Sequence, residues 1–175
     1  MRTDEQLALL SKPALQPISR LGLTSDDCLI VCAGFEDRAV GVLREAATCG
    51  ARFKVIVIEY LPAIQENRLE EFLTVCVSVG VPFARLIYDR QNPTGFGEVL
   101  AECTASRKGR LFIDVSGMSR LLIVQALVAL RCVDYRSMRV LYSEAEYYPP
   151  SKEEVEVAIL KSNVDPLYAG LFLSC

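Results

Sequence analysis

Five short apolar runs, each followed by a longer stretch with helical spacing or by a turn, constrain the fold of this chain more than any other feature. They include CLIVCA at residues 28–33, FKVIVIE at 53–59 and RLFIDV at 110–115. Such runs carry apolar side chains on both faces of an extended segment, which is typical of strands buried on both sides. Buried strands that alternate with helices indicate a parallel sheet covered by helices.

The element boundaries follow from these runs and from the periodicity between them. We predict strands at 28–33, 53–59, 82–88, 110–115 and 138–143, and helices at 36–48, 65–79, 98–106 and 121–132. Crossovers between parallel strands are right-handed in nearly all known cases. The predicted fold is therefore a Rossmann-like, three-layer α/β sandwich with helices on both faces of a mostly parallel five-stranded sheet in the order 3-2-1-4-5.

The length of 175 residues suits one domain. We predict a single domain over 1–175, with an N-terminal helix or arm at 1–23, a core at 24–148 and a C-terminal helical extension at 149–175. The final PLYAGLFLSC is unusually apolar, because chain termini are more often polar and frayed. This segment packs on the core or forms a dimer contact, or the sequence is a piece of a longer protein.

Charge and residue types exclude several functions. The formal net charge is −3, so no overall positive field attracts bulk nucleic acid. The chain has no histidine, which excludes Ser-His-Asp and Cys-His chemistry within it and removes the commonest metal ligand. We expect no metal and no cofactor, unless the chain is a hydrolase that uses Mg²⁺.

The cysteines and the N-terminus indicate the compartment. The seven cysteines include no CxxC pair and fit neither a zinc site nor a disulfide framework. The N-terminal stretch is too charged for a signal peptide, and no apolar run approaches the roughly 20 residues of a membrane helix. We therefore expect a cytoplasmic protein in a reducing compartment, with no membrane association.

Two polar loops that contain glycine follow the first and fourth predicted strands. They read GFEDR at 34–38 and DVSGMSR at 114–120. In the predicted strand order these strands are neighbours whose connections leave on opposite faces, which opens a ligand crevice at their carboxyl ends. We therefore expect the two loops to meet in space, although they are far apart in the sequence.

The chemistry of these loops suits an anion. Ser116 and Ser119 offer hydroxyls, and Gly117 lets the backbone approach a ligand closely. The start of the next helix supplies N–H groups and partial positive charge. Arg38 and Arg120 can each bind phosphate in a bidentate way. The predicted ligand-binding residues are Gly34, Phe35, Asp37, Arg38, Asp114, Ser116, Gly117, Met118, Ser119, Arg120 and Glu144.

Simpler roles stay open for several of these residues. Asp37 and Ser119 suit helix N-caps. Asp114 could accept a hydrogen bond from a ribose hydroxyl or orient an arginine, or it could only hold the shape of its loop. The two arginines could be ordinary surface residues. With Glu59 and Glu144, the two aspartates could also form an acidic cluster for Mg²⁺.

The stretch FIDVSGMSR at 112–120, followed by an apolar helix and the VLY strand at 140–142, resembles the CRISPR-associated Rossmann fold (CARF) domains. Their signature is a strand ending in Asp or Asn, a Ser/Thr- and Gly-rich turn, and a Lys or Arg that opens the next helix. The resemblance spans residues 28–148, and the turn departs from the pattern in having one Gly and a Met. It implies a dimeric domain of prokaryotic antiviral defence that binds cyclic oligoadenylates and works with an effector.

Three functions are compatible with these features. The first is a nucleotide-sensing domain, present as a homodimer or with a partner effector protein, that binds a nucleotide or cyclic oligonucleotide between the two loops. The second is a nucleotide hydrolase, phosphodiesterase or nuclease, with Asp37, Asp114 and Glu144 as acid–base or metal-binding groups. The third is a scaffold domain of a larger assembly, suggested by the apolar C-terminal segment.

Overall fold

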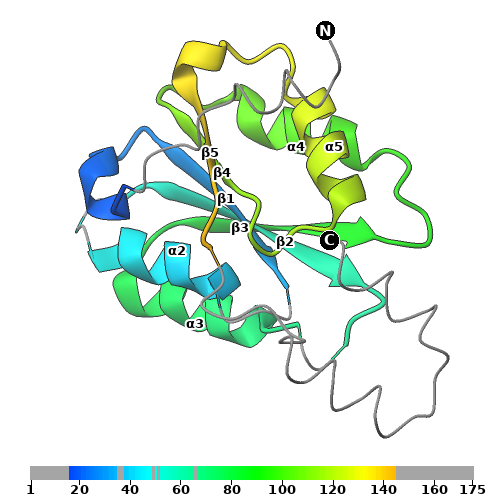
Figure 1. Cartoon of the computed structure of the whole chain (residues 1–175), viewed down its shortest axis with the longest axis horizontal. Coiled ribbons are helices and arrows are strands. Elements are labelled where there is room, and N and C mark those ends of the chain that lie inside the picture. The colour runs from blue at the N-terminus through cyan, green and yellow to red at the C-terminus, as the bar shows by residue number, and fades with distance from the viewer. Residues whose placement is uncertain (1–15, 35–37, 49, 51, 65–66, 145–175) are drawn as a thin grey trace, which may run out of the picture. The chain divides into compact units, whose positions relative to one another are not determined.

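In the computed structural model, a five-stranded parallel sheet lies between two layers of helices (Figure 1). The structure describes residues 16–34, 38–48, 50, 52–64 and 67–144. The chain forms two compact units, Met1–Ser143 and Glu144–Cys175. Every described residue belongs to the first unit except Glu144, which begins the second. The predicted C-terminal extension and most of the predicted N-terminal arm lie outside the described residues.

The sheet has the order β3-β2-β1-β4-β5, which confirms the predicted topology. All four strand pairings are parallel. The strands are β1 (Cys28–Ala33), β2 (Lys54–Leu61), β3 (Phe83–Asp89), β4 (Leu111–Asp114) and β5 (Met138–Leu141). The helices are α2 (Arg38–Thr48), α3 (Leu69–Val79), α4 (Phe96–Ala105) and α5 (Arg120–Ala129), with short 3-10 helices η1 (Ile18–Leu21) and η2 (Tyr135–Ser137).

Local hydrogen bonding sets where the helices and strands end, and some of these ends differ from the predicted ones. β5 ends at Leu141 rather than at Ser143, because the Ser143 amide donates to the Ser116 hydroxyl instead of continuing the ladder. α3 ends where predicted, at Gly80, whose positive φ of 69° lets its amide bond back to the last turn. These differences do not change which strands are neighbours.

The two faces of the sheet build two separate apolar cores. Along β1, Leu29 and Val31 pack in the core under α2 and α3, whereas Ile30 and Cys32 pack in the core under α4 and α5. This division follows from the alternation of side chains along a strand. It confirms that the apolar runs of β1, β2 and β4 are strands buried on both faces. The edge strands β3 and β5 are partly exposed instead, with Ile87 at 58% and Val140 at 52% exposure.

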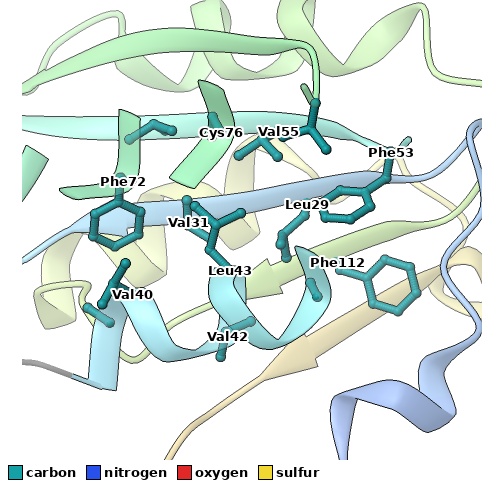
Figure 2. Packing of buried hydrophobic residues seen from close by; sticks show 14 of the residues in the cluster. Leu29, Val31, Val40, Val42, Leu43, Phe53, Val55, Phe72, Cys76 and Phe112 are labelled. Atoms are coloured by element: carbon teal, nitrogen blue, oxygen red, sulfur yellow. The ribbon is translucent and has the colours of Figure 1, made fainter. Parts of the chain in front are cut away.

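Figure 2 shows the first core, in which Leu43 of α2 and Phe72 of α3 pack near Val31 of β1. Leu43, Phe72 and Val31 are each 0% exposed. Complete burial of side chains of this size contributes roughly 1.5–3 kcal/mol each to folding. The core therefore fixes α2 against the sheet and sets the position of the residue that opens it, Arg38.

One helix face remains uncovered by the described residues. On α5, Leu121, Val124 and Val128 are 53%, 58% and 51% exposed, although the opposite side of the helix packs in the core. A helix that is apolar all round is usually buried on all sides. Among the described helices, none has the length and apolar character required to cross a membrane.

Candidate functional site

The loops after β1 and β4 touch through two glycines. A Cβ atom on Gly34 would lie 2.8 Å from the carbonyl oxygen of Gly117. A Cβ on Gly117 would lie 2.5 Å from the carbonyl oxygen of Cys32 and 2.9 Å from the Cβ of Ala39. No larger residue fits at either position without moving backbone. The expected meeting of the two loops is therefore present, and it depends on the missing side chains.

Asp114 ends β4 and is the most deeply buried polar group beside this contact, at 1% exposure. Its Oδ1 accepts from the Ser116 amide at 3.0 Å and from the Ser116 hydroxyl at 2.5 Å. Its Oδ2 has no hydrogen-bond partner within the part of the chain that the structure describes. Burial raises the pKa of Asp114 to about 6, although the bonds from Ser116 and the charge of Arg38 oppose the shift.

Ser116 braces the loop from within. Its hydroxyl donates to Asp114 and accepts from the amide of Ser143 at 2.7 Å, and the residue is 5% exposed. The loop after β4 is thereby tied to the chain that leaves β5. The hydroxyl predicted to face a ligand is thus engaged inside the protein, so Ser116 supports the site rather than presenting a free donor.

Arg38 is the first residue of α2 and reaches across to the end of β5. Its Nη1 donates to the Tyr142 hydroxyl at 2.8 Å and to the Ser143 carbonyl at 2.9 Å. The guanidinium carbon lies 5.0 Å from the centre of the Tyr142 ring. Arg38 therefore holds a defined position, and its positive charge opposes part of the rise that burial causes in the pKa of Asp114.

The second half of the β4 loop starts α5. Ser119 is its N-cap, with its hydroxyl accepting from the Leu122 amide at 3.3 Å, so the simpler role considered for this residue is present. Arg120 is exposed at the first helical position. Met118 is 9% exposed and packs in the core under α4 and α5, where its side chain fills space.

Two residues that the sequence did not single out join this cluster. The Tyr60 hydroxyl, at the end of β2, accepts from the Ser119 amide at 2.5 Å. The Arg90 guanidinium carbon lies 4.4 Å from the centre of the Tyr60 ring. Burial raises the pKa of Tyr60 to about 12, so the phenol stays protonated. The available signal was a polar-tipped aromatic residue at the carboxyl end of an apolar strand.

The remaining predicted residues contribute less or lie elsewhere. Phe35 and Asp37 lie outside the described residues. Glu144 belongs to the second compact unit, so it has no described position relative to the β4 loop. Glu59 forms an ion pair with Arg85 at 2.6 Å. Within the described ranges, no three His, Cys, Asp or Glu side chains gather as a potential metal site.

Two hollows in the described part of the chain lie away from the β4 loop. A groove of about 500 Å³ between α4 and α5 is lined mainly by small and apolar residues, with Gln125 at its wall. A smaller pocket of about 240 Å³ is lined by Lys54, Arg107 and Lys108. Lys54 and Arg107 also donate to carbonyls in the last turn of α4, so their charges stabilise that helix end.

Together, the fold and this edge define a Rossmann-like α/β domain whose polar side chains gather where β1 and β4 send their connections to opposite faces. No protein-family model matches the chain, and no curated protein matches it. The contact of the two glycine loops and the buried Asp114 beside it are therefore the features that indicate a function.

Proposed function

We propose that this chain is a nucleotide-sensing, CARF-like ligand-binding domain that holds a phosphate-containing ligand between the loops after β1 and β4. The observation that carries the proposal is Oδ2 of Asp114, which is buried beside the contact of the two glycine loops and has no hydrogen-bond partner among the described residues. Buried polar atoms in proteins are nearly always hydrogen-bonded, so this carboxylate oxygen is expected to accept a hydrogen bond from a donor on the ligand. A ribose hydroxyl is a donor of the required kind.

Positive groups for the phosphate open the two helices that follow these loops. Arg38 is fixed at the start of α2, and Arg120 is exposed at the start of α5. The backbone amides of Arg120 and Leu121 make no hydrogen bond with the described part of the chain. Free amides at a helix N-terminus bind anions, and the helix dipole adds to the attraction. These groups support a phosphate next to a ribose.

The proposed sensor works with a partner, either a second copy of the chain or an effector protein, that covers the exposed face of α5. The exposed apolar residues Leu121, Val124 and Val128 lie on α5, the helix that the β4 loop opens. A partner that covered them would sit next to the ligand and could sense its presence. Antiviral defence in a prokaryotic cytoplasm is the setting that the CARF resemblance implies for such a sensor.

Calorimetry with cyclic oligoadenylates and cyclic dinucleotides tests the proposal. We expect Arg120→Ala to weaken binding about tenfold or more, a loss of about 1.4 kcal/mol. Arg131→Ala removes the same charge beyond the other end of α5 and should leave affinity unchanged. A wild-type protein that binds no member of the panel, or an Arg120→Ala variant that binds like the wild type, contradicts it.

A nucleotide hydrolase, phosphodiesterase or nuclease is the alternative that one observation favours. The pKa of Asp114 is raised to about 6, and a carboxyl poised near neutral pH is suited to general acid–base catalysis. A turnover assay on the same ligands, with and without Mg²⁺, distinguishes the two functions. If Asp114→Asn turns over ligand at the wild-type rate, the catalytic role of this carboxyl is excluded.

A further inference from the structure

Arg90 is a cation held in place without using its hydrogen-bond donors. Its backbone amide, just after β3, donates to the Leu61 carbonyl at 2.9 Å, which fixes the chain at this point. Its guanidinium carbon lies 4.4 Å from the centre of the Tyr60 ring. The side chain is exposed and makes no hydrogen bond or ion pair with the described residues. Stacking on a ring leaves the N–H groups at the guanidinium edge available.

Tyr60 links this arginine to the candidate site. Its ring is 5% exposed and packs edge-on against Tyr88, with the ring centres 5.7 Å apart. Its hydroxyl accepts from the Ser119 amide at 2.5 Å and lies 3.5 Å from the Gly117 carbonyl oxygen. The position of Arg90 is therefore coupled through one rigid ring to the loop that begins α5.

The two fixed arginines, Arg38 and Arg90, approach the carboxyl edge from opposite faces of the sheet. Arg38 opens α2, which covers one face, whereas Arg90 lies on Tyr60, whose ring belongs to the core under α4 and α5. The contact between Gly34 and Gly117 lies at the same edge. The space that a side chain at either glycine would occupy is filled by neighbouring atoms of the protein, so a ligand that reaches the cations on both faces has to cross outside this contact.

We infer that Arg90 forms a second anion-binding subsite, with Tyr60 as its positioning residue, so that the ligand carries two separate phosphate groups. This inference rests on the proposed function, because it concerns the same ligand. An arginine edge binds phosphate through two parallel N–H···O bonds. A ligand with one phosphate can occupy only the subsite at Arg38 and Arg120, whereas a ligand with two phosphates spans the edge.

Calorimetry with AMP, which has one phosphate, and cyclic di-AMP, which has two, tests the second subsite. We expect Arg90→Ala to weaken cyclic di-AMP binding about tenfold and to leave AMP binding within roughly twofold of wild type. Arg90→Lys keeps the charge without the planar fork and should recover only part of the loss. Arg131→Ala is the control for charge. Because Arg90 is exposed, thermal unfolding of Arg90→Ala should match that of the wild type.

A double-mutant cycle tests the positioning role of Tyr60. Tyr60→Leu removes the stacking ring and should weaken cyclic di-AMP binding as Arg90→Ala does, with no further loss in the double variant. Tyr60→Phe retains the ring and should retain most of the affinity. A purely structural role would instead weaken AMP and cyclic di-AMP equally in Tyr60→Leu, which would contradict positioning.

The outcomes for the two proposals differ. If the wild type binds neither probe nor any other member of the cyclic-nucleotide panel, both the proposed function and the second subsite are overturned. If Arg120→Ala loses cyclic di-AMP while Arg90→Ala binds it like the wild type, only the second subsite is overturned. If Arg90→Ala weakens the binding of AMP as much as that of cyclic di-AMP, Arg90 belongs to the first subsite. The inference that the ligand carries two separate phosphate groups is then overturned.

Discussion

Two buried aspartates stand at opposite edges of the sheet, and their surroundings differ. Asp27 directly precedes β1 at the amino edge, and Asp114 ends the neighbouring strand β4 at the carboxyl edge. Each is 1% exposed. The two carboxyls are therefore equally shielded from solvent, but their hydrogen-bond partners differ.

Asp27 is fully partnered. Its Oδ1 accepts from the Arg110 amide at 2.7 Å, and its Oδ2 accepts from the Arg110 guanidinium at 2.7 Å and from the Thr24 amide at 2.8 Å. Burial alone would raise the pKa of Asp27, but the hydrogen bonds from Arg110 and Thr24 outweigh it and lower the pKa. Asp114 has only Ser116 on one oxygen, and burial raises its pKa.

The difference indicates separate purposes for the two edges. At the amino edge, every oxygen of the buried carboxyl is satisfied, which stabilises the fold. At the carboxyl edge, one oxygen of the buried carboxyl has no hydrogen-bond partner among the described residues, which destabilises the free protein. Under the proposed function, a ligand supplies the missing donor. Proteins commonly accept such a loss of stability at functional sites. Substitutions at the two edges test this contrast.

Removing the amino-edge carboxyl should have the largest effect. Asp27→Ala removes the acceptor of the Thr24 and Arg110 amides and leaves the Arg110 guanidinium with only the Leu21 and Gly22 carbonyls. We expect a loss of about 3 kcal/mol in the free energy of unfolding. Urea denaturation at pH 7 measures it. The exposed neighbour Asp26 is the matched control, because Asp26→Ala removes the same charge and should cost less than about 0.5 kcal/mol. Equal losses in both variants would contradict a special role for Asp27.

Adding one methyl group at the carboxyl edge should cost about 2 kcal/mol, because Gly117→Ala places a Cβ within 2.5 Å of the Cys32 carbonyl. Gly41→Ala is the control. Gly41 lies inside α2 with nothing within 4 Å of the added atom, so the substitution should stabilise the protein by about 0.5–1 kcal/mol. Thermal unfolding compares the pair, and tolerance of alanine at Gly117 would contradict the tight contact of the two loops.

Neutralising the carboxyl-edge aspartate should stabilise the protein. The folded-state pKa of Asp114, about 6, lies above the ordinary value of 3.8, so the folded state binds more protons between these values and stability falls as pH rises through them. A shift of this size corresponds to about 3 kcal/mol at pH 7. Asp114→Asn removes this loss but places an amide N–H group where Oδ2 has no hydrogen-bond partner among the described residues, so we expect a net gain of about 2 kcal/mol at pH 7 that disappears toward pH 4. Urea denaturation across this pH range measures it. A gain that does not change with pH would contradict the shifted pKa.

The smallest expected effects come from two tyrosine hydroxyls of neighbouring strands. The buried hydroxyl of Tyr88 has no hydrogen-bond partner among the described residues. We therefore expect Tyr88→Phe to leave the free energy of unfolding unchanged or to raise it by up to about 1 kcal/mol. The Tyr60 hydroxyl accepts from Ser119, so Tyr60→Phe should cost about 1 kcal/mol. Equal changes in unfolding free energy would show that the bond to Ser119 contributes nothing measurable.

Much of the fold could be predicted because it depends on patterns that extend along the chain. The apolar runs predict the strands, and the helical spacing between runs predicts the connections. The pattern did not distinguish the three strands buried on both faces from the partly exposed edge strands β3 and β5. The strand order then follows from general rules of handedness and winding. The two glycine loops could be identified for the same reason, since each directly follows a buried strand.

The amino-acid sequence was therefore enough to predict the strands, the helices between them and the two loops that share an edge. Which groups in those loops are already hydrogen-bonded depends on the folded chain. Ser116 bonds with Asp114 and Ser143, whereas Oδ2 of Asp114 has no hydrogen-bond partner among the described residues. The fold also brings Tyr60 and Arg90, from β2 and the chain after β3, to the loop that opens α5. Periodicity records which face a residue occupies, whereas hydrogen-bond partners come from segments distant in sequence.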